Sequence, residues 1–105
     1  MREIKDIREH IGKVVKTGKY ILGSKETISN LLVGNPKIVI LSDKCPINLK
    51  ERILYYSRLS EVPCIVVKEG SFDLGAACGK PFPVSAFTVL KEGESNIMKF
   101  IREEN

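Results

Sequence analysis

Apolar side chains recur at three- and four-residue steps in five segments of the chain. In the first segment they are Ile4, Ile7, Ile11, Val14 and Val15, which predicts an amphipathic helix ending near residues 17–18. Similar spacing predicts further helices at about 25–33, 45–60, 71–78 and 95–103. One face of each helix should therefore pack against a core.

The longest of these predicted helices carries Leu49, Ile53, Tyr56 and Leu59 on one stripe. Tyr55 directly precedes Tyr56, and neighbouring residues on a helix point in different directions. We therefore expect the stripe to face the core and only one of the two tyrosines to point inward.

Short apolar runs alternate with the helical segments and predict four strands, at about 19–22, 37–42, 64–68 and 85–91. The run at 37–42 is uninterrupted, which is typical of a strand buried on both faces. Alternating strands and helices indicate an α/β protein, a three-layer αβα sandwich with a mixed, largely four-stranded sheet. Ligands of such sheets gather at the turns between strands and helices.

Composition limits the class of protein. The 105 residues suit a single domain, 1–105, and the 43% hydrophobic and 29% charged content is that of a soluble protein with no membrane partner. Three separated cysteines and one histidine make a zinc site improbable, so we expect no metal and no cofactor. Cys64 lies in an apolar run and should be a small core residue, and free thiols suit a reducing cytosol.

The net charge is +4, which favours a polyanionic partner. A charge of this size does not distinguish RNA from an acidic protein or a membrane surface. The basic residues form no block of five, so a basic site would have to be assembled by folding.

The most informative turn of the chain is Gly23 to Thr27, between an apolar run and a helical pattern. A strand that turns into a helix here leaves backbone N–H groups pointing outward, with Lys25 and Glu26 beside them. Each residue also has a plain structural interpretation. Gly23 suits a tight turn and Ser24 a helix cap, whereas Lys25 suits a solvated surface position. Glu26 suits the positive end of a helix.

A second candidate loop, Gly79 to Val84, holds Phe82 between Pro81 and Pro83. An aromatic between two prolines has little local chance of burial. A stiff apolar platform, together with polar groups on the first turn, suits a nucleic acid with an exposed base. The alternative is that Phe82 closes the end of the core.

Four sequence blocks, at residues 23–27, 54–60, 73–82 and 92–95, occur in an order and spacing that resemble one family. They read Gly-Ser-Lys-Glu-Thr, Leu-Tyr-Tyr-Ser-Arg-Leu-Ser, Asp-Leu-Gly-Ala-Ala-Cys-Gly-Lys-Pro-Phe and Glu-Gly-Glu-Ser. The chain resembles the large-subunit ribosomal protein thirty family of archaea and eukaryotes, within the wider superfamily of kink-turn RNA-binding ribosomal proteins. The resemblance spans nearly the whole chain.

This resemblance implies a sharply bent RNA target, in which two stems flank a bulge with sheared G·A pairs and one extruded nucleotide. The RNA-binding residues that it implies are Gly23, Ser24, Lys25, Glu26, Thr27, Lys44, Lys80, Phe82, Pro83 and Val84. Lys25 and Glu26 would contact guanine edges. Residues 82–84 would receive the extruded base. Lys44 stands where the family commonly carries an asparagine, so we expect a phosphate contact there.

Arg58 and Lys37 are weaker candidates for phosphate contacts. The resemblance further implies a structural constituent of the large ribosomal subunit in the cytoplasm. Its partners would be ribosomal RNA and neighbouring ribosomal proteins, and the free protein would be monomeric. Its own messenger RNA is an additional target that the sequence leaves open.

Two other functions stay open on the residues alone. One is an enzyme of small metabolites, in which the Gly23 turn holds a phosphate and Lys25 or Cys78 acts chemically. The other is a protein-interaction module that uses Tyr55, Tyr56 and Phe82. The chain carries none of the usual nucleotide-binding or triad motifs, which disfavours an enzyme.

Overall fold

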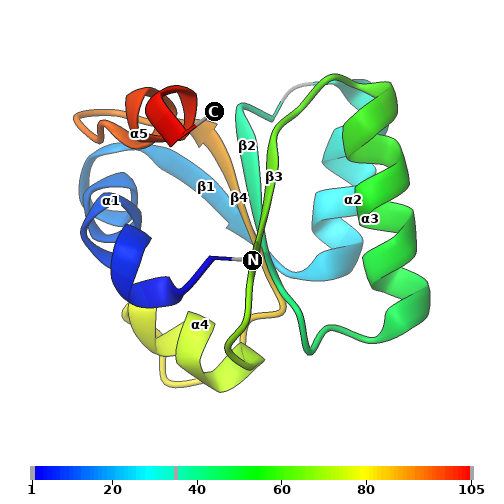
Figure 1. The fold of residues 1–105 in the computed structure, drawn as a ribbon, viewed down its shortest axis with the longest axis horizontal. Helices are drawn as coiled ribbons and strands as arrows, with labels where there is room; N and C mark the ends of the chain where they lie inside the picture. The colour runs from blue at the N-terminus through cyan, green and yellow to red at the C-terminus, as the bar shows by residue number, and fades with distance from the viewer. Residues whose placement is uncertain (1, 35, 105) are drawn as a thin grey trace.

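The structure is a computed structural model that describes residues 2–34 and 36–104. The elements follow one another as α1 (Ile4–Thr17), β1 (Lys19–Leu22), α2 (Ser24–Val33), β2 (Ile38–Ser42), α3 (Ile47–Leu59), β3 (Cys64–Val67), α4 (Ser71–Ala77), β4 (Ala86–Lys91) and α5 (Ile97–Glu104). Helices cover both faces of a central sheet, so the predicted three-layer αβα sandwich is confirmed (Figure 1).

The sheet has the strand order β1-β4-β2-β3. β2 pairs with β3 in parallel, whereas β4 runs antiparallel to both β1 and β2. The four-stranded mixed sheet is therefore as predicted. It follows that β1, β2 and β3 all end at the edge of the sheet where β4 begins.

Side chains of the strands alternate between two cores. On β2, Ile38 and Ile40 pack with α1, α4 and α5, whereas Val39 and Leu41 pack with α2 and α3. All five residues of β2 are buried, which confirms that this strand is covered on both faces.

Helix α3 departs from the predicted stripe at its end. Ile53 is buried and Tyr56 packs against the α2–α3 core, while Tyr55 is exposed, as expected. Leu59 is 63% exposed, so its predicted place in the core is wrong. The physical reason is that Leu59 is the last helical residue, where the chain already turns toward β3 and Ser57 takes the buried position.

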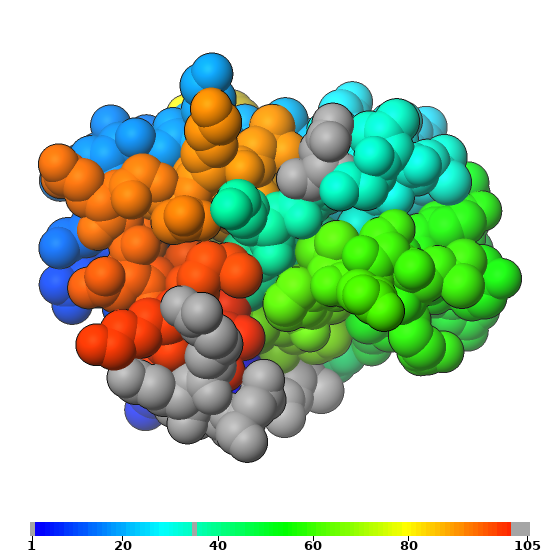
Figure 2. All heavy atoms as spheres, turned by 90° about the horizontal axis from the view of Figure 1, so that it is seen from above, coloured from blue at the N-terminus to red at the C-terminus, as the bar shows by residue number. Residues whose placement is uncertain are grey.

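The edge at which β1 and β2 begin and β4 ends faces the viewer in Figure 2. The backbone is closely packed at two places on this edge: a Cβ on Gly18 would lie 2.2 Å from the Lys91 carbonyl, and one on Gly93 would lie 2.5 Å from the Thr17 carbonyl.

Across the described ranges, no helix is long and apolar enough to cross a bilayer, and no three His, Cys, Asp or Glu residues are grouped as a metal site would need.

Candidate functional site

Four loops meet at the edge where β1, β2 and β3 end and β4 begins, the lower edge of the sheet in Figure 1. They are β1–α2, β2–α3, β3–α4 and α4–β4, and they carry both turns singled out in the sequence. The Gly23 N–H donates to the Ala86 carbonyl at 2.9 Å, and the Ser42 N–H donates to the Ser85 carbonyl at 3.0 Å. These bonds join the early turn, the late loop and the end of β2 into one surface.

Gly23 has φ +107°, a conformation that side chains with a Cβ rarely adopt. A Cβ there would also lie 2.6 Å from the Glu26 Oε2, so the Glu26 carboxylate folds back over the glycine. Helix α2 begins at Ser24, and no side chain caps this end among the residues described. The interpretation of Ser24 as a helix cap is therefore wrong, because Gly23 occupies the cap position.

Lys25 and Glu26 are exposed on the first turn of α2, as a recognition surface requires. Thr27 lies just behind them and is fully buried. Its hydroxyl donates to the Gly23 carbonyl at 2.7 Å and lies 2.6 Å from the Thr88 hydroxyl. As a correction to the predicted site, the Thr27 side chain faces β4 and holds the turn from behind, so it is not available to a ligand at the surface.

Lys44 is exposed in the loop after β2, and its backbone N–H donates to the Ser42 hydroxyl at 3.1 Å. The same hydroxyl donates to the Glu69 carbonyl at 2.7 Å. Ser42 is fully buried and so ties together the loops that follow β2 and β3. Beside it, the ion pair with Lys50 holds the pKa of Asp43 below its usual range, chiefly through a side-chain hydrogen bond.

The late loop keeps its aromatic in the open. Phe82 is 47% exposed, and its neighbours Pro81 and Pro83 are exposed as well, so Phe82 does not close the core. Val84 is only 2% exposed and packs in the core beneath α1 and α4. As a second correction, Val84 anchors the loop from within, and its side chain cannot line a surface that receives a base.

Helix α4 supports the late loop directly. A Cβ on Gly75 would lie 2.1 Å from the Phe82 carbonyl, so the loop backbone rests on the helix at the glycine. The Val84 N–H donates to the Ser71 carbonyl at 2.9 Å, and the Lys80 N–H donates to the Gly75 carbonyl at 2.9 Å. The half-buried Lys80 places its ammonium 5.6 Å from the centre of the Tyr20 ring on β1, which brings it toward the first turn.

The structure thus brings together residues 23–27, Lys44 and residues 80–84, and it separates the two weaker candidates from them. Lys37 precedes β2, at the opposite edge of the sheet. Arg58 lies in the last turn of α3, whose first turn follows the site edge, so about 15 Å of helix intervenes.

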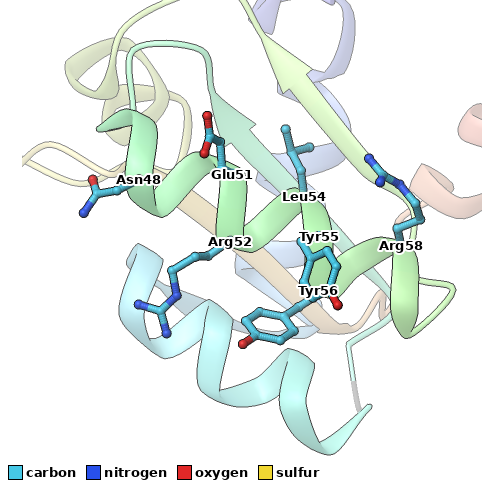
Figure 3. Close-up of a pocket in the computed structure, with 7 residues that line it drawn as sticks. All are labelled: Asn48, Glu51, Arg52, Leu54, Tyr55, Tyr56 and Arg58. Carbon is cyan, nitrogen blue, oxygen red and sulfur yellow. The ribbon is translucent and has the colours of Figure 1, made fainter.

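Arg58 instead borders a shallow hollow on the outer face of α3, lined also by Asn48, Glu51, Arg52, Leu54, Tyr55 and Tyr56. In Figure 3, Arg52 and Tyr56 point toward α2, whereas Glu51, Leu54 and Arg58 lie on the other side of the helix. The hollow is therefore a shallow surface along α3, and none of its lining residues belongs to the four loops.

The cysteines offer no activated nucleophile. Burial raises the pKa of the Cys78 thiol to about 12 and that of the Cys64 thiol to about 11. Burial also raises the pKa of Cys45. A thiol needs a lowered pKa to react readily at neutral pH. Burial of the thiol therefore disfavours Cys78 as a nucleophile.

Three contributors to this edge were missed in the sequence. Ser42 and Thr88 are polar residues within apolar strands, a signal of a buried hydrogen-bonding role. Phe72 is 74% exposed at the start of α4, directly after the loop that joins β3 to this helix. The signal that could have identified Phe72 was an aromatic residue at the start of a predicted helix.

Comparison with known proteins gives the same family for nearly the full chain. Residues 5–99 match the family described as "Ribosomal protein L7Ae/L30e/S12e/Gadd45 family". The chain is 47% identical to the large ribosomal subunit protein eL30 of Methanocaldococcus jannaschii over 103 residues, 98% of this chain and 94% of the relative. It is 40% identical to the protein of the same name from Methanopyrus kandleri over 100 residues, 95% and 92% of the two chains. The chain therefore belongs to the ribosomal protein L7Ae/L30e/S12e/Gadd45 family.

Proposed function

We propose that this chain is a structural, non-enzymatic constituent of the large ribosomal subunit that binds and stabilises a kink-turn in ribosomal RNA. The names of its relatives support a place in the large ribosomal subunit. The resemblance of its turns to those of kink-turn binders supports the kink-turn as the RNA element that it binds. The observation that carries the proposal is that Lys25, Glu26 and Phe82 are all exposed on one edge whose loops are joined by backbone hydrogen bonds.

Recognition of the bent RNA begins at the start of α2. The Lys25 ammonium donates to guanine O6 or N7, and the Glu26 carboxylate accepts from guanine N–H groups that a sheared G·A pair leaves free. The Ser24 N–H lies beside them at the start of the helix, while Gly23 lets the backbone approach the RNA closely and uses its own N–H to bond the Ala86 carbonyl. Because Thr27 fixes this turn from behind, the backbone that carries the two side chains needs little ordering on binding.

Phe82 provides the apolar surface for the extruded base, supported by Pro83. Base stacking on an aromatic contributes about 1–3 kcal/mol. Lys44 and Lys80 neutralise phosphates that the bend forces together, which positions the RNA without reading its sequence. Val84 anchors this loop in the core. The protein thus favours the bent RNA because the base-edge contacts exist only in that form.

The same recognition extends to its own messenger RNA wherever that message forms the same bend. In the cytoplasmic ribosome, neighbouring ribosomal proteins would contact surfaces outside the four loops. The free protein would be monomeric, since the proposed site needs no residue from a second copy. A phosphate-binding enzyme is the weaker alternative, because the site holds no activated thiol.

Affinity measurements with two RNAs test the proposal. One RNA contains a kink-turn, and the control has its sheared G·A pairs replaced by Watson–Crick pairs. We expect nanomolar binding to the kink-turn that weakens steeply with salt, and much weaker binding to the control. Equal affinities would reject structure-specific recognition.

The roles of Lys25 and Lys44 differ in the same assay. Lys25→Ala should weaken kink-turn binding by about 1–3 kcal/mol and reduce discrimination against the control RNA. Lys44→Ala should weaken binding to both RNAs similarly and lower the salt dependence by about one phosphate contact.

A further inference from the structure

Three lysines line a groove at the edge of the sheet opposite the four loops. They are Lys19 at the start of β1, Lys91 at the end of β4 and Lys37 just before β2, and they share this groove with Thr17, Gly18, Leu90, Glu92 and Gly93. Lys19 pairs directly with Lys91 across β1 and β4, and the Lys37 N–H donates to the Val89 carbonyl at 2.8 Å. The backbones of the three lysines therefore lie next to one another at the ends of three adjacent strands, and all three residues border one groove.

Figure 2 looks onto this edge, and the blue start of β1, the orange end of β4 and the green-cyan start of β2 lie next to one another there. All three lysines are exposed. Within the ranges that the structure describes, none of them has a carboxylate within 4.0 Å, unlike Lys5, Lys50 and Lys68, which form ion pairs. Their charges are thus available to an external anion.

The backbone beneath the lysines is held in one position. The Gly18 and Gly93 contacts with Lys91 and Thr17 allow the α1–β1 and β4–α5 turns to pack backbone against backbone. The Glu94 N–H also donates to the Thr17 hydroxyl at 2.9 Å. A fixed backbone beneath the lysines lowers part of the cost of ordering them around a ligand.

We propose that this groove, formed by Lys19, Lys37 and Lys91, is a second RNA site that binds the phosphate backbone of a segment other than the kink-turn. This inference relies on the proposed RNA partner but not on kink-turn specificity. Three lysines at the ends of adjacent strands, whose backbones lie about 5 Å apart across the sheet, suit a row of phosphates. The site reads no bases, because its groove presents few base-edge contacts beside the cations.

RNA is favoured over an acidic protein as the occupant of this groove. Lysine is depleted at protein–protein interfaces, whose centres are apolar and aromatic. Leu90 is the one large apolar side chain among the described residues that line the groove. Glu92 also lines it, and its carboxylate would repel either polyanion, so the preference for RNA depends on the lysines and on the small apolar area.

The two sites lie at opposite ends of the strands. β4 has six residues, so the two edges are about 20 Å apart. A single short kink-turn held at the four loops would leave the second groove facing away from it. The chain would therefore join two segments of RNA, which is a suitable role for a small protein inside a large RNA assembly.

The test uses the full chain saturated with an unlabelled minimal kink-turn RNA, and measures binding of a labelled RNA duplex that has no kink-turn. We expect the wild-type complex to bind the duplex, and Lys19→Ala/Lys37→Ala/Lys91→Ala to weaken duplex binding about tenfold or more and lower the salt slope by about three. Lys→Arg at the same three positions should keep binding within about threefold of wild type, because the charge remains.

The matched control removes three other exposed cations, Lys5→Ala/Arg8→Ala/Arg52→Ala, and should keep most of the duplex affinity. Thermal unfolding confirms that each variant is folded. A groove variant that binds the duplex as well as this control does, or a complex that prefers polyglutamate to the duplex, would overturn the second site. If wild type fails to bind the kink-turn RNA, the proposed function fails, and the duplex titration of the free protein still tests the groove.

Discussion

The hydroxyl groups of Thr27 and Thr88 lie 2.6 Å apart inside the protein, directly behind the turn that presents Lys25 and Glu26. The Thr27 hydroxyl donates to the Gly23 carbonyl at 2.7 Å, so its single hydrogen is used and Thr88 is the donor between the two threonines. A short chain of hydrogen bonds thus runs from the middle of β4 to the glycine at the edge. It connects the sheet to the proposed recognition surface.

This chain predicts a stability difference between single and double variants. Thr27→Val should lower the free energy of unfolding by about 1–3 kcal/mol, because it leaves the Thr88 hydroxyl without its buried partner and the Gly23 carbonyl with the Thr27 N–H alone as a donor. Adding Thr88→Val should recover part of that loss, since one unpaired group is removed. Urea unfolding of the two single variants and the double variant measures both effects. Strictly additive losses would contradict the hydrogen-bonded pair.

Two glycines provide a matched test of the late loop. Gly75→Ala places a Cβ 2.1 Å from the Phe82 carbonyl, so we expect it to destabilise the protein by about 1–3 kcal/mol and to weaken kink-turn binding. Gly12→Ala, in α1, meets no atom within 4 Å and should stabilise the protein by about 1 kcal/mol. Thermal unfolding compares the two. Similar effects at both positions would argue against close packing of the loop on α4.

Replacing Phe82 should affect RNA binding much more than it affects folding stability. Its side chain is 47% exposed, so Phe82→Ala should change the free energy of unfolding by no more than about 0.5 kcal/mol. Kink-turn binding should fall by about 1–3 kcal/mol as the stacking surface is lost. Tyr55→Ala, which removes another exposed aromatic on α3, is the control and should leave RNA affinity unchanged. Unchanged affinity in the Phe82 variant would place the extruded base elsewhere.

The buried thiol of Cys78 predicts a dependence of stability on alkaline pH. Burial raises its pKa from 9.0 to about 12, so above about pH 9 the unfolded chain releases a proton that the folded chain keeps. The contribution is complete below the unfolded pKa and is lost as the pH rises toward 12. Urea unfolding from pH 8 to pH 11 should show wild type losing stability relative to Cys78→Ala. A constant difference between the two proteins would mean that the thiol titrates normally.

Periodicity was sufficient to predict the architecture. The all-apolar run of β2 indicated a covered strand, and the alternation of strands and helices indicated the layers, because both patterns depend on burial alone. Leu59 was placed wrongly, since an apolar stripe does not reveal where a helix stops facing its neighbour.

The site was predicted less completely. Exposure of Lys25, Glu26 and Phe82 agrees with their local sequence, but the inward orientation of Thr27 and Val84 depends on partners far away in the chain, Thr88 on β4 and the α1–α4 core. The order β1-β4-β2-β3 inserts the last strand between the first two, which local patterns do not specify. Ser42 acquires its role only through that arrangement.

Binding of the RNA and its bending by the protein can be measured in one experiment. A kink-turn RNA labelled on its two stems reports the bend by fluorescence energy transfer while the protein is titrated in low magnesium. We predict that energy transfer rises at the same protein concentrations that bind the RNA, and that Lys25→Ala and Phe82→Ala shift both curves equally. RNA that binds tightly while its stems stay apart would contradict it.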